Sequence, residues 1–467
     1  MIVQQSFRRG ITDCKNVFSA CGKDKVHDTF LSNALRFFPR VINLESYDFH
    51  NIFLLNASGC MQRRDFVSQI ALGGVLGSIA GAEDAAPALT NQGDVTADGK
   101  QEATKLVTTP LSLMAPRPEG VDAIWGVSEY CKGKIEWQGP DGTNGVIDCD
   151  PFGMVPQGDR VIKVSLNGLA RGTDYRVRSI STDASGKRTE VSEWKSFQTL
   201  NPEAAATRFV VWNDTHVHND TIQQLHSLTP RADFLLWNGD TCNDWTREDL
   251  LIPTLLNPGD CDITDGRPLM FVWGNHDVRG RWAYKLPEMV TTPSGRPFYA
   301  FRSGPVACIC LHTGEDKPDE HPSFGGRVAF DDLRQEQTEW LAEVIVTPEY
   351  RDAPYRVVFC HIPLRWLTET VPNYSAGGYD SFSHRNRQAW HESLVAWGTQ
   401  VIVSGHMHRH AWMPPTPEIP YGQLVGGGPA MTQATWIEAQ ANHERLELRM
   451  RKLDGSEVES VTLKPLV

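Results

Sequence analysis

The sequence predicts an α/β protein in which two layered sheets are flanked by helices, with a smaller all-β sandwich in front of them. Turn signals separate short strand-like runs throughout residues 106–200, as in small all-β domains. In residues 207–467 short apolar runs alternate with helical patterns, and such runs are typical of strands buried on both faces. The end of this second region changes to polar–apolar alternation around a hairpin signal at Lys452–Gly455, which indicates antiparallel strands.

The length and net charge of the chain limit the number of domains and the classes of partner that are expected. A chain of 467 residues is too long for one core, so two or three domains are expected. The formal net charge of −12 argues against nucleic acid as the main partner, because phosphate backbones are bound by clusters of lysine and arginine. It does not exclude a phosphorylated small-molecule substrate, because bound metal ions can reverse the local charge.

The N-terminal region is predicted to contain an export signal. Residues 1–60 have no clear periodicity, and after them come the pair Arg63 and Arg64 and an uncharged Gly/Ala-rich run, Ile70–Ala82. A basic start, a short apolar stretch and a small-residue exit at residues 80–82 are typical of a signal peptide. The Arg-Arg-x-Phe form resembles a twin-arginine signal. The alternative is a short amphipathic or buried helix.

Three segments are therefore expected at this end. Because a signal works poorly behind a long extension, we expect Met61 to be the true start and residues 1–60 to be an upstream translation artefact or a disordered extension. Residues 61–82 form the twin-arginine-type signal peptide, and the polar residues 83–105 form a linker. The apolar run is too short to span a bilayer. The protein is expected to be exported, to the periplasm or the medium.

The cysteines permit disulfide bonds, but the sequence does not determine which cysteines pair. Seven of the ten lie after the proposed signal, and export permits disulfides. Cys131 with Cys149, and Cys242 with Cys261, are plausible pairs, although connectivity cannot be deduced from sequence alone.

The all-β region resembles an immunoglobulin or fibronectin type III sandwich. Its predicted strands are residues 123–127, 134–137, 161–166, 175–180 and 194–197. The pattern Leu-x-x-Leu-x-x-Gly-Thr-x-Tyr that ends at Tyr175 is similar to the tyrosine corner of such sandwiches, with Trp125 as the core aromatic. Since residues 106–200 contain no catalytic constellation, a structural role is expected for them.

The second region has the strands and helices of an α/β domain. Its predicted apolar strands are residues 208–212, 234–237, 269–273, 306–310, 355–359 and 400–403, and its predicted alternating strands are residues 433–438, 445–450 and 458–463. Helical stripes are predicted over residues 331–346 and 386–397.

Five short segments with metal-binding residue types follow five of these apolar strands directly. They are Asp214-Thr215-His216, Gly239-Asp240, Gly274-Asn275-His276-Asp277, His361 and Gly405-His406-Met407-His408. The carboxyl ends of strands are where ligands collect in α/β sheets. Five such ends at one crevice would bring these side chains together.

The residue types and their spacing suit two neighbouring metal ions. In an extended segment Asp214 and His216 point the same way and can face one ion. His406 and His408 can do the same, or each can face a different ion. Asp240 can bridge, because a carboxylate has two oxygens. The mix of Asp, Asn and His suits two divalent or trivalent ions, namely Zn, Fe or Mn.

The ordered series resembles the calcineurin-like metallophosphoesterase superfamily, whose pattern is D-x-H, G-D, G-N-H-[DE], H and G-H-x-H. All five blocks are present in this order between residues 214 and 408. One block alone would mean little, whereas the full ordered set is specific. The preceding sandwich makes the chain similar to purple acid phosphatases, which place a fibronectin-like domain before the catalytic one. The resemblance implies a four-layer α/β/β/α metallophosphoesterase sandwich for residues 207–467.

The resemblance also implies roles for individual residues. The implied ligands are Asp214, His216, Asp240 and His408 for the first metal, and Asp240, Asn275, His361 and His406 for the second. By this resemblance, a hydroxide bridging the metals would be the nucleophile, and the two ions would clamp the attacking and leaving oxygens. His276 would be the general acid, and Asp277 would hold its ring.

Two positions depart from purple acid phosphatases. Those enzymes carry a metal-bound tyrosine three residues after the bridging aspartate, where this chain has Asn243. They also lack a histidine at the position of His216. The chain is therefore not expected to be purple, and iron(III) loses its main support.

The substrate is less well defined than the metal site. Arg279 and Arg281 follow the third block and are candidates to clamp a phosphate oxygen, with a surface ion pair as the alternative. Hydrolysis of phosphate mono- or diesters is the expected activity. The alternatives are a pyrophosphatase acting on nucleotides or nucleotide sugars, and a non-catalytic, metal-containing protein that binds a surface polymer.

Overall fold

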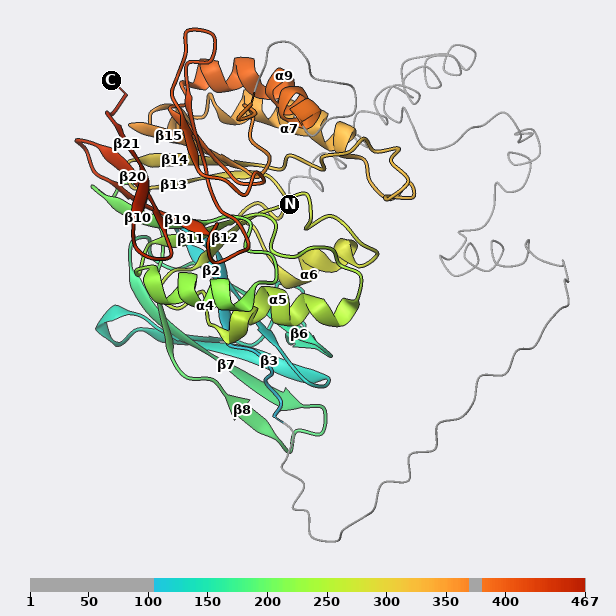
Figure 1. The fold of residues 1–467 in the computed structure, drawn as a ribbon. Coiled ribbons are helices and arrows are strands. Elements are labelled where there is room, and N and C mark those ends of the chain that lie inside the picture. The colour runs from blue at the N-terminus through green and yellow to red at the C-terminus, as the bar shows by residue number, and fades with distance from the viewer. Residues whose placement is uncertain (1–104, 369–379, 467) are drawn as a thin grey trace, which may run out of the picture. The chain divides into compact units, whose positions relative to one another are not determined.

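The computed structural model describes residues 105–368 and 380–466, which belong to one compact unit (Figure 1). The predicted extension, signal peptide and linker lie outside the described residues and stay predictions. Among the described residues, no helix has both the length and the apolar character needed to cross a membrane.

The described strands form three sheets, whose orders are as follows. The nine-stranded sheet runs β21 (Glu457–Leu463), β20 (Leu446–Lys452), β19 (Thr435–Ala441), β10 (Thr207–Trp212), β11 (Phe234–Asn238), β12 (Leu269–Val272), β1 (Ser112–Arg117), β2 (Gly120–Gly126), β6 (Val161–Asn167). The six-stranded sheet runs β13 (Tyr299–Ser303), β14 (Val306–Leu311), β15 (Tyr355–Cys360), β16 (Val401–Ser404), β18 (Gly422–Val425), β17 (Ala411–Met413). The third runs β4 (Asn144–Ile147), β3 (Cys131–Gln138), β7 (Asp174–Asp183), β8 (Thr189–Val191), with β5 (Gln157–Gly158) on β3 and β9 (Lys195–Gln198) on β7.

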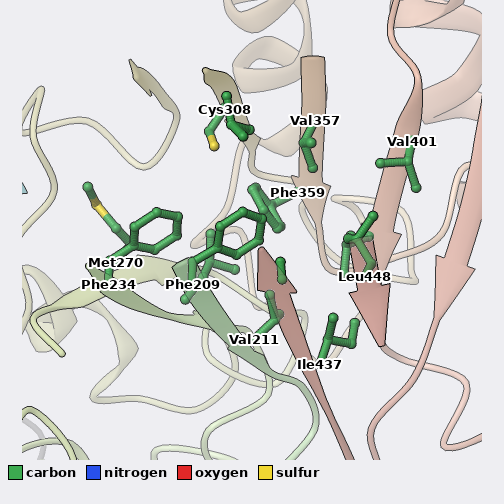
Figure 2. Close-up of a cluster of buried hydrophobic side chains, with 14 of the residues drawn as sticks. Phe209, Val211, Phe234, Met270, Cys308, Val357, Phe359, Val401, Ile437 and Leu448 are labelled. Atoms are coloured by element: carbon green, nitrogen blue, oxygen red, sulfur yellow. The ribbon is translucent and has the colours of Figure 1, made fainter. Parts of the chain in front are cut away.

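The two larger sheets face each other across one apolar core. Phe209, Val211 and Phe234 contribute from the nine-stranded sheet, and Val357 and Phe359 from the six-stranded one (Figure 2). All five are fully buried. The continuous apolar strands are explained by this arrangement, because each such strand also packs against helices on its outer side.

Helices cover the outer faces of both sheets. Against the nine-stranded sheet lie α4 (Asn219–Leu228), α5 (Leu251–Leu256) and α6 (Leu286–Met289). Against the six-stranded sheet lie α7 (Phe330–Val344) and α9 (Asp380–Trp397), with the short α8 (Pro348–Arg351) nearby. The layers of Figure 1 are therefore helix, sheet, sheet, helix. The helices predicted over residues 331–346 and 386–397 are confirmed, and the second begins at Asp380.

The N-terminal strands are joined to the nine-stranded sheet. Strand β1 pairs in parallel with β12 through Met114 and Leu269. The third sheet packs on β1, β2 and β6 through a buried cluster that includes Trp125 and Tyr175. The Tyr175 hydroxyl accepts a hydrogen bond from the backbone N–H of Ala170 at 2.9 Å, as a tyrosine corner would. Kinship with fibronectin type III domains stays a prediction.

The proposed disulfides are wrong for this structure. Cys131 is buried and Cys149 is exposed, and both are unpaired. Cys242 and Cys261 are unpaired as well. The Cys242 thiol instead lies 3.6 Å from the carbonyl oxygen of His276.

Candidate metal centre

The five predicted segments meet because their strands are parallel neighbours. Strands β10, β11 and β12 pair in parallel in one sheet, and β15 pairs in parallel with β16 in the other. Parallel strands place their carboxyl ends at the same edge of a sheet. Each of these five strands is followed by one of the predicted segments, so both sheets contribute side chains to one site.

A buried asparagine ties the two sheets together beneath this site. Asn238, the last residue of β11, is fully buried and its Nδ2 donates to Asn213 Oδ1 at 2.8 Å. The same Nδ2 lies 3.4 Å from the carbonyl oxygen of Cys360 and 3.3 Å from that of Val403, both in the other sheet. The Asn238 carbonyl oxygen lies 2.8 Å from His361 Nδ1. This residue therefore fixes the spacing of four strand ends.

Replacing Asn238 with alanine should destabilise the fold. The substitution leaves the buried oxygens of Asn213, Cys360 and Val403 without this donor, and an unsatisfied buried group costs about 1–3 kcal/mol. We expect the free energy of unfolding to fall by about 2–3 kcal/mol in urea titrations. The matched control is Asn144→Ala, because Asn144 is exposed and its side-chain Nδ2 donates to the nearby carbonyl oxygen of Gly142. Equal stability of the two variants would contradict this account.

Seven predicted ligands form two adjoining groups. Asp214, His216 and His408 each offer an atom within 4.8 Å of the others, and so do Asp240, His361 and His406. The seventh, Asn275, joins the second group, where its Oδ1 lies 2.8 Å from His406 Nδ1. This division matches the two ligand sets that the resemblance implies, apart from the shared position of Asp240.

Asp240 lies between the two groups. Its Oδ2 is 3.1 Å from His361 Nε2 in its own group and 3.9 Å from His216 Nε2 in the other. Asp214 makes a similar connection, because its Oδ1 is 3.6 Å from His408 Nε2 and 3.7 Å from His361 Nε2. Both carboxylates are buried. The arrangement allows one carboxylate to bridge two cations.

The backbone at the ligand positions is strained. Asp214, His216, Asp240, His406 and His408 all have positive φ, between 45° and 69°. Residues other than glycine rarely adopt this left-handed region, and such strain concentrates at functional sites. The strain is offset locally, since both Asp214 oxygens accept a hydrogen bond from the His406 N–H, at 2.8 and 2.9 Å.

Two glycines allow the segments to approach each other. A Cβ at Gly274 would lie 2.2 Å from both the amide nitrogen and Oδ1 of Asp240, and one at Gly405 would lie 2.4 Å from Asp214 Oδ2. No side chain fits at these distances. The glycines of the predicted blocks are thus explained by close packing of the loops around the carboxylates.

Burial and neighbouring charges shift the pKa values of the ligand residues in both directions. Burial lowers the pKa of His216 to about 4 and that of His406 to about 3, so both rings are neutral near pH 7. Burial raises the pKa of Asp214 to about 8, although His361 opposes the shift. At His361 the effect of burial is outweighed by Asp240 and Asp214, which raise its pKa to about 10. The neutral His216 and His406 rings can bind a metal as they are, whereas His361 and Asp214 would each release a proton when a cation binds.

The residues present fit a metal centre. The buried ring nitrogens His361 Nε2 and His216 Nδ1 have no hydrogen-bond partner among the described residues. His361 Nε2 is close to Asp240 Oδ2, at 3.1 Å, but without hydrogen-bond geometry. A buried polar atom without a partner is costly, and coordination of a cation would satisfy His361 Nε2. Oxygen and imidazole donors together suit Zn, Fe or Mn.

Asp277 has a different role from the one expected. Its carboxylate accepts hydrogen bonds from the backbone N–H groups of Gly274 and Asp240, both at 2.8 Å, and of Thr241 at 3.0 Å. The Thr241 hydroxyl donates as well, at 2.6 Å. The prediction that Asp277 holds the His276 ring is therefore wrong. Asp277 instead holds the segment that carries Asp240 against its own segment, Gly274–Asp277.

His276 lies beside the ligands and partly faces solvent. Its side chain is 28% exposed, and its ring centroid is 5.1 Å from that of His216. The Nδ1 atom is hydrogen-bonded to the carbonyl oxygen of Asn243, and Asp244 Oδ1 lies 3.6 Å from it. The Asn243 carbonyl thus takes the orienting role that Asp277 was expected to fill. The ring is separate from both groups of ligands.

Arg279 and Arg281 have different surroundings. Arg279 Nη1 lies 3.0 Å from His276 Nε2, so this arginine reaches the site. Arg281 stacks on Trp282, with its guanidinium carbon 5.4 Å from the ring centroid. It lines a separate cavity of about 360 Å³ together with Tyr284 and others. Within the described part of the chain, Arg281 forms no hydrogen bond or ion pair with the ligands.

Two acidic residues beside the site escaped the sequence analysis. Glu315 and Asp316 both pair with Arg279, and their side chains are 0% and 5% exposed. They follow β14, whose carboxyl end adjoins that of β15. Their position after a strand end is a signal of the same kind as the one that identified the ligands. They were missed because neither residue belongs to a recognised motif.

The geometry agrees with comparisons to known proteins. Residues 207–410 match the family model described as calcineurin-like phosphoesterase. The chain is similar to serine/threonine-protein phosphatase CPPED1 of Pongo abelii, with 24% identity over 264 residues, covering 52% of this chain and 79% of that protein. It is also similar to purple acid phosphatase 15 of Arabidopsis thaliana, with 23% identity over 159 residues, 32% of this chain and 26% of that protein.

Two solved structures share the fold. The structure of purple acid phosphatase PPD1 from yellow lupin (Lupinus luteus) seeds has a TM-score of 0.58 and 14% identity, covering 76% of this chain and 75% of that one. The structure of PhoD has a TM-score of 0.50 and 12% identity, covering 76% of this chain and 88% of that one. At these identities the likeness concerns the fold alone.

Proposed function

We propose that this chain, whose residues 207–410 match the calcineurin-like phosphoesterase model, is a metal-dependent hydrolase that uses two metal ions to hydrolyse phosphate mono- or diesters. The pair of ligand groups carries this proposal, Asp214-His216-His408 and Asp240-His361-His406. Asn275 would complete the second group. When bound, the ions supply an activated water for attack on phosphorus and neutralise charge on the phosphoryl oxygens.

His276 is the proposed general acid. The Asn243 carbonyl accepts the Nδ1 proton, so the protonated ring has a transferable proton at Nε2. In this structure Arg279 Nη1 lies 3.0 Å from Nε2, and because a guanidinium group can only donate, Nε2 is the acceptor in the resting ring and must be protonated before it can serve as the acid. Proton transfer to the leaving alkoxide from Nε2 avoids expelling an unstable anion.

The substrate class is tested by a panel of phosphoesters. We expect the metal-loaded protein to hydrolyse p-nitrophenyl phosphate, bis-p-nitrophenyl phosphate or both. A nucleotide sugar tests the pyrophosphatase alternative, and a phosphoserine peptide is included because a similar protein is named a serine/threonine-protein phosphatase. If the protein binds two metals and cleaves none of these esters, the proposal is refuted. The alternative of a non-catalytic, metal-containing protein would then be favoured.

The purified protein is expected to be colourless. The position that would hold a tyrosinate ligand in a purple acid phosphatase is Asn243, and this residue cannot give tyrosinate-to-iron charge transfer. The visible absorption spectrum of metal-loaded protein checks this. A strong tyrosinate–iron band in the unchanged protein would contradict this prediction.

Export through a twin-arginine signal is proposed as well. Its support is the sequence pattern around Arg63 and Arg64 alone. Expression of the chain from Met61 with both arginines replaced by lysine should retain it in the cytoplasm, whereas the unchanged chain should be exported and cleaved near Ala82. Cytoplasmic retention of the unchanged chain would refute the proposal.

A further inference from the structure

A sixth strand end contributes charged residues to the proposed active site. Strand β14 ends at Leu311, and the chain then reaches Glu315 and Asp316, which are almost completely buried. Isolated carboxylates are rarely buried, because desolvation of the charge is costly. The partners of these two residues therefore need an explanation, and both meet Arg279.

All three nitrogens of the Arg279 guanidinium have separate partners. Nε is paired with Glu315 Oε1, and Nη2 donates to Asp316 Oδ1 at 2.8 Å. The remaining nitrogen, Nη1, lies 3.0 Å from His276 Nε2 and 3.3 Å from Nδ1. A planar guanidinium held on two of its nitrogens cannot rotate, so the position of Nη1 is fixed.

The charges of this cluster are balanced. Lys317 Nζ lies 3.5 Å from Glu315 Oε2 and also pairs with Asp316. Two acidic and two basic side chains therefore neutralise each other, and the Arg279 side chain remains 18% exposed. Balanced pairing permits these charges to be buried. The exposed part of Arg279 is thus left for contact with a ligand.

We propose that Glu315 and Asp316 are positioning residues that hold Arg279 beside His276, where Arg279 binds an oxygen of the substrate's phosphoryl group. The inference rests on the proposed function. Guanidinium groups bind phosphate oxygens strongly, and a group fixed in advance loses little freedom when the substrate binds. Arg279 is the residue that touches substrate, whereas Glu315 and Asp316 act through it. Arg281, which lines a separate cavity, has no part in this contact.

A double-mutant cycle tests the positioning role. We expect Glu315→Gln to lower kcat/KM for the best substrate of the panel by about 10–100-fold, because a small misplacement of a substrate-binding group can cost about 10²-fold. In the Arg279→Ala background the same change should have little further effect, because residues that act through one another are not additive. Asp316→Asn should behave in the same way. Metal content and thermal midpoint are measured for each variant.

Chemical rescue separates a positioning role from a structural one. Guanidinium ion added to Arg279→Ala should restore part of the lost activity while Glu315 and Asp316 are present, and less in the Arg279→Ala/Glu315→Gln variant. A purely structural ion pair would show no such rescue. The matched control is Glu336→Gln, because Glu336 forms an exposed pair with Arg296 at 3.0 Å. This variant should keep wild-type kcat/KM.

The outcomes separate the inference from the proposed function. If the wild type hydrolyses a phosphoester but the effects of Glu315→Gln and Arg279→Ala simply multiply, the inference is overturned and the proposed function stands. If Glu315→Gln fails to fold, the cycle with Asp316→Asn decides in the same way. If the metal-loaded wild type hydrolyses none of the esters, both are overturned.

Discussion

Asp240→Asn is expected to lower kcat/KM by about 10³-fold and to reduce the metal content below two ions per chain. The Asp240 carboxylate approaches a histidine of each ligand group, at 3.1 Å from His361 Nε2 and 3.9 Å from His216 Nε2. Although burial opposes it, the neighbouring His361 imidazole holds the pKa of Asp240 well below its usual range. An asparagine has only one oxygen acceptor, so it cannot bridge two ions. Loss of several kcal/mol of charge stabilisation corresponds to this fold-change.

The measurement combines steady-state kinetics with elemental metal analysis of the same preparation. Asp352→Asn is the matched control, because Asp352 is exposed and pairs with Arg351 at 2.7 Å. It should keep wild-type activity and metal content. Retention of two ions and normal kcat/KM in Asp240→Asn would show that this carboxylate does not bridge the metals.

His276→Ala is expected to abolish most activity while both metals stay bound. Its ring lies outside the two ligand groups, so removing it deletes no proposed ligand. Loss of a general acid typically costs about 10²–10⁴-fold in rate. The loss should be smaller for an ester with a good leaving group, such as nitrophenolate, than for an alkyl phosphate, because a good leaving group needs less protonation.

His443→Ala is the matched control for this variant, since His443 is 82% exposed. If His276→Ala also loses metal, the ring would be a ligand rather than an acid. An equal loss for esters with good and poor leaving groups would likewise contradict proton donation by His276.

The ligand set could be predicted because it depends on strand ends. Apolar runs such as residues 208–212 and 355–359 become β10 and β15 within a residue or two. The side chains that follow parallel strands then meet at one edge. Asp214, Asp240 and His361 could thus be assigned to one site without knowledge of the loops between them.

The partners of backbone groups could not be predicted. Asp277 bonds to the N–H groups of Gly274, Asp240 and Thr241, and no pattern of side chains reveals such acceptors. The sequence suggested that Asp277 holds the ring of its neighbour His276, whereas in the structure its carboxylate bonds to these backbone groups instead. A carboxylate can only be assigned a role when the direction of the surrounding amides is known.

Strand β1 shows a second limit of sequence reasoning. It contains Pro116, its Ala115 has a φ of 50°, and its register with β2 shifts between Met114 and Arg117. Proline and bulges are typical of irregular strands, so the sequence alone does not indicate this one. Its pairing with β12 joins the N-terminal strands to the sheet that holds Asp240.

Reconstitution of metal-free protein tests the central claim most directly. Asp214, His216 and His408 on one side, and Asp240, His361 and His406 on the other, predict two ions per chain and a phosphoesterase that needs both. Phosphoester hydrolysis should therefore rise with added Zn, Fe or Mn until two equivalents are bound, and then stay constant. Full activity at one equivalent, or two tightly bound ions without hydrolysis of any phosphoester, would contradict the account.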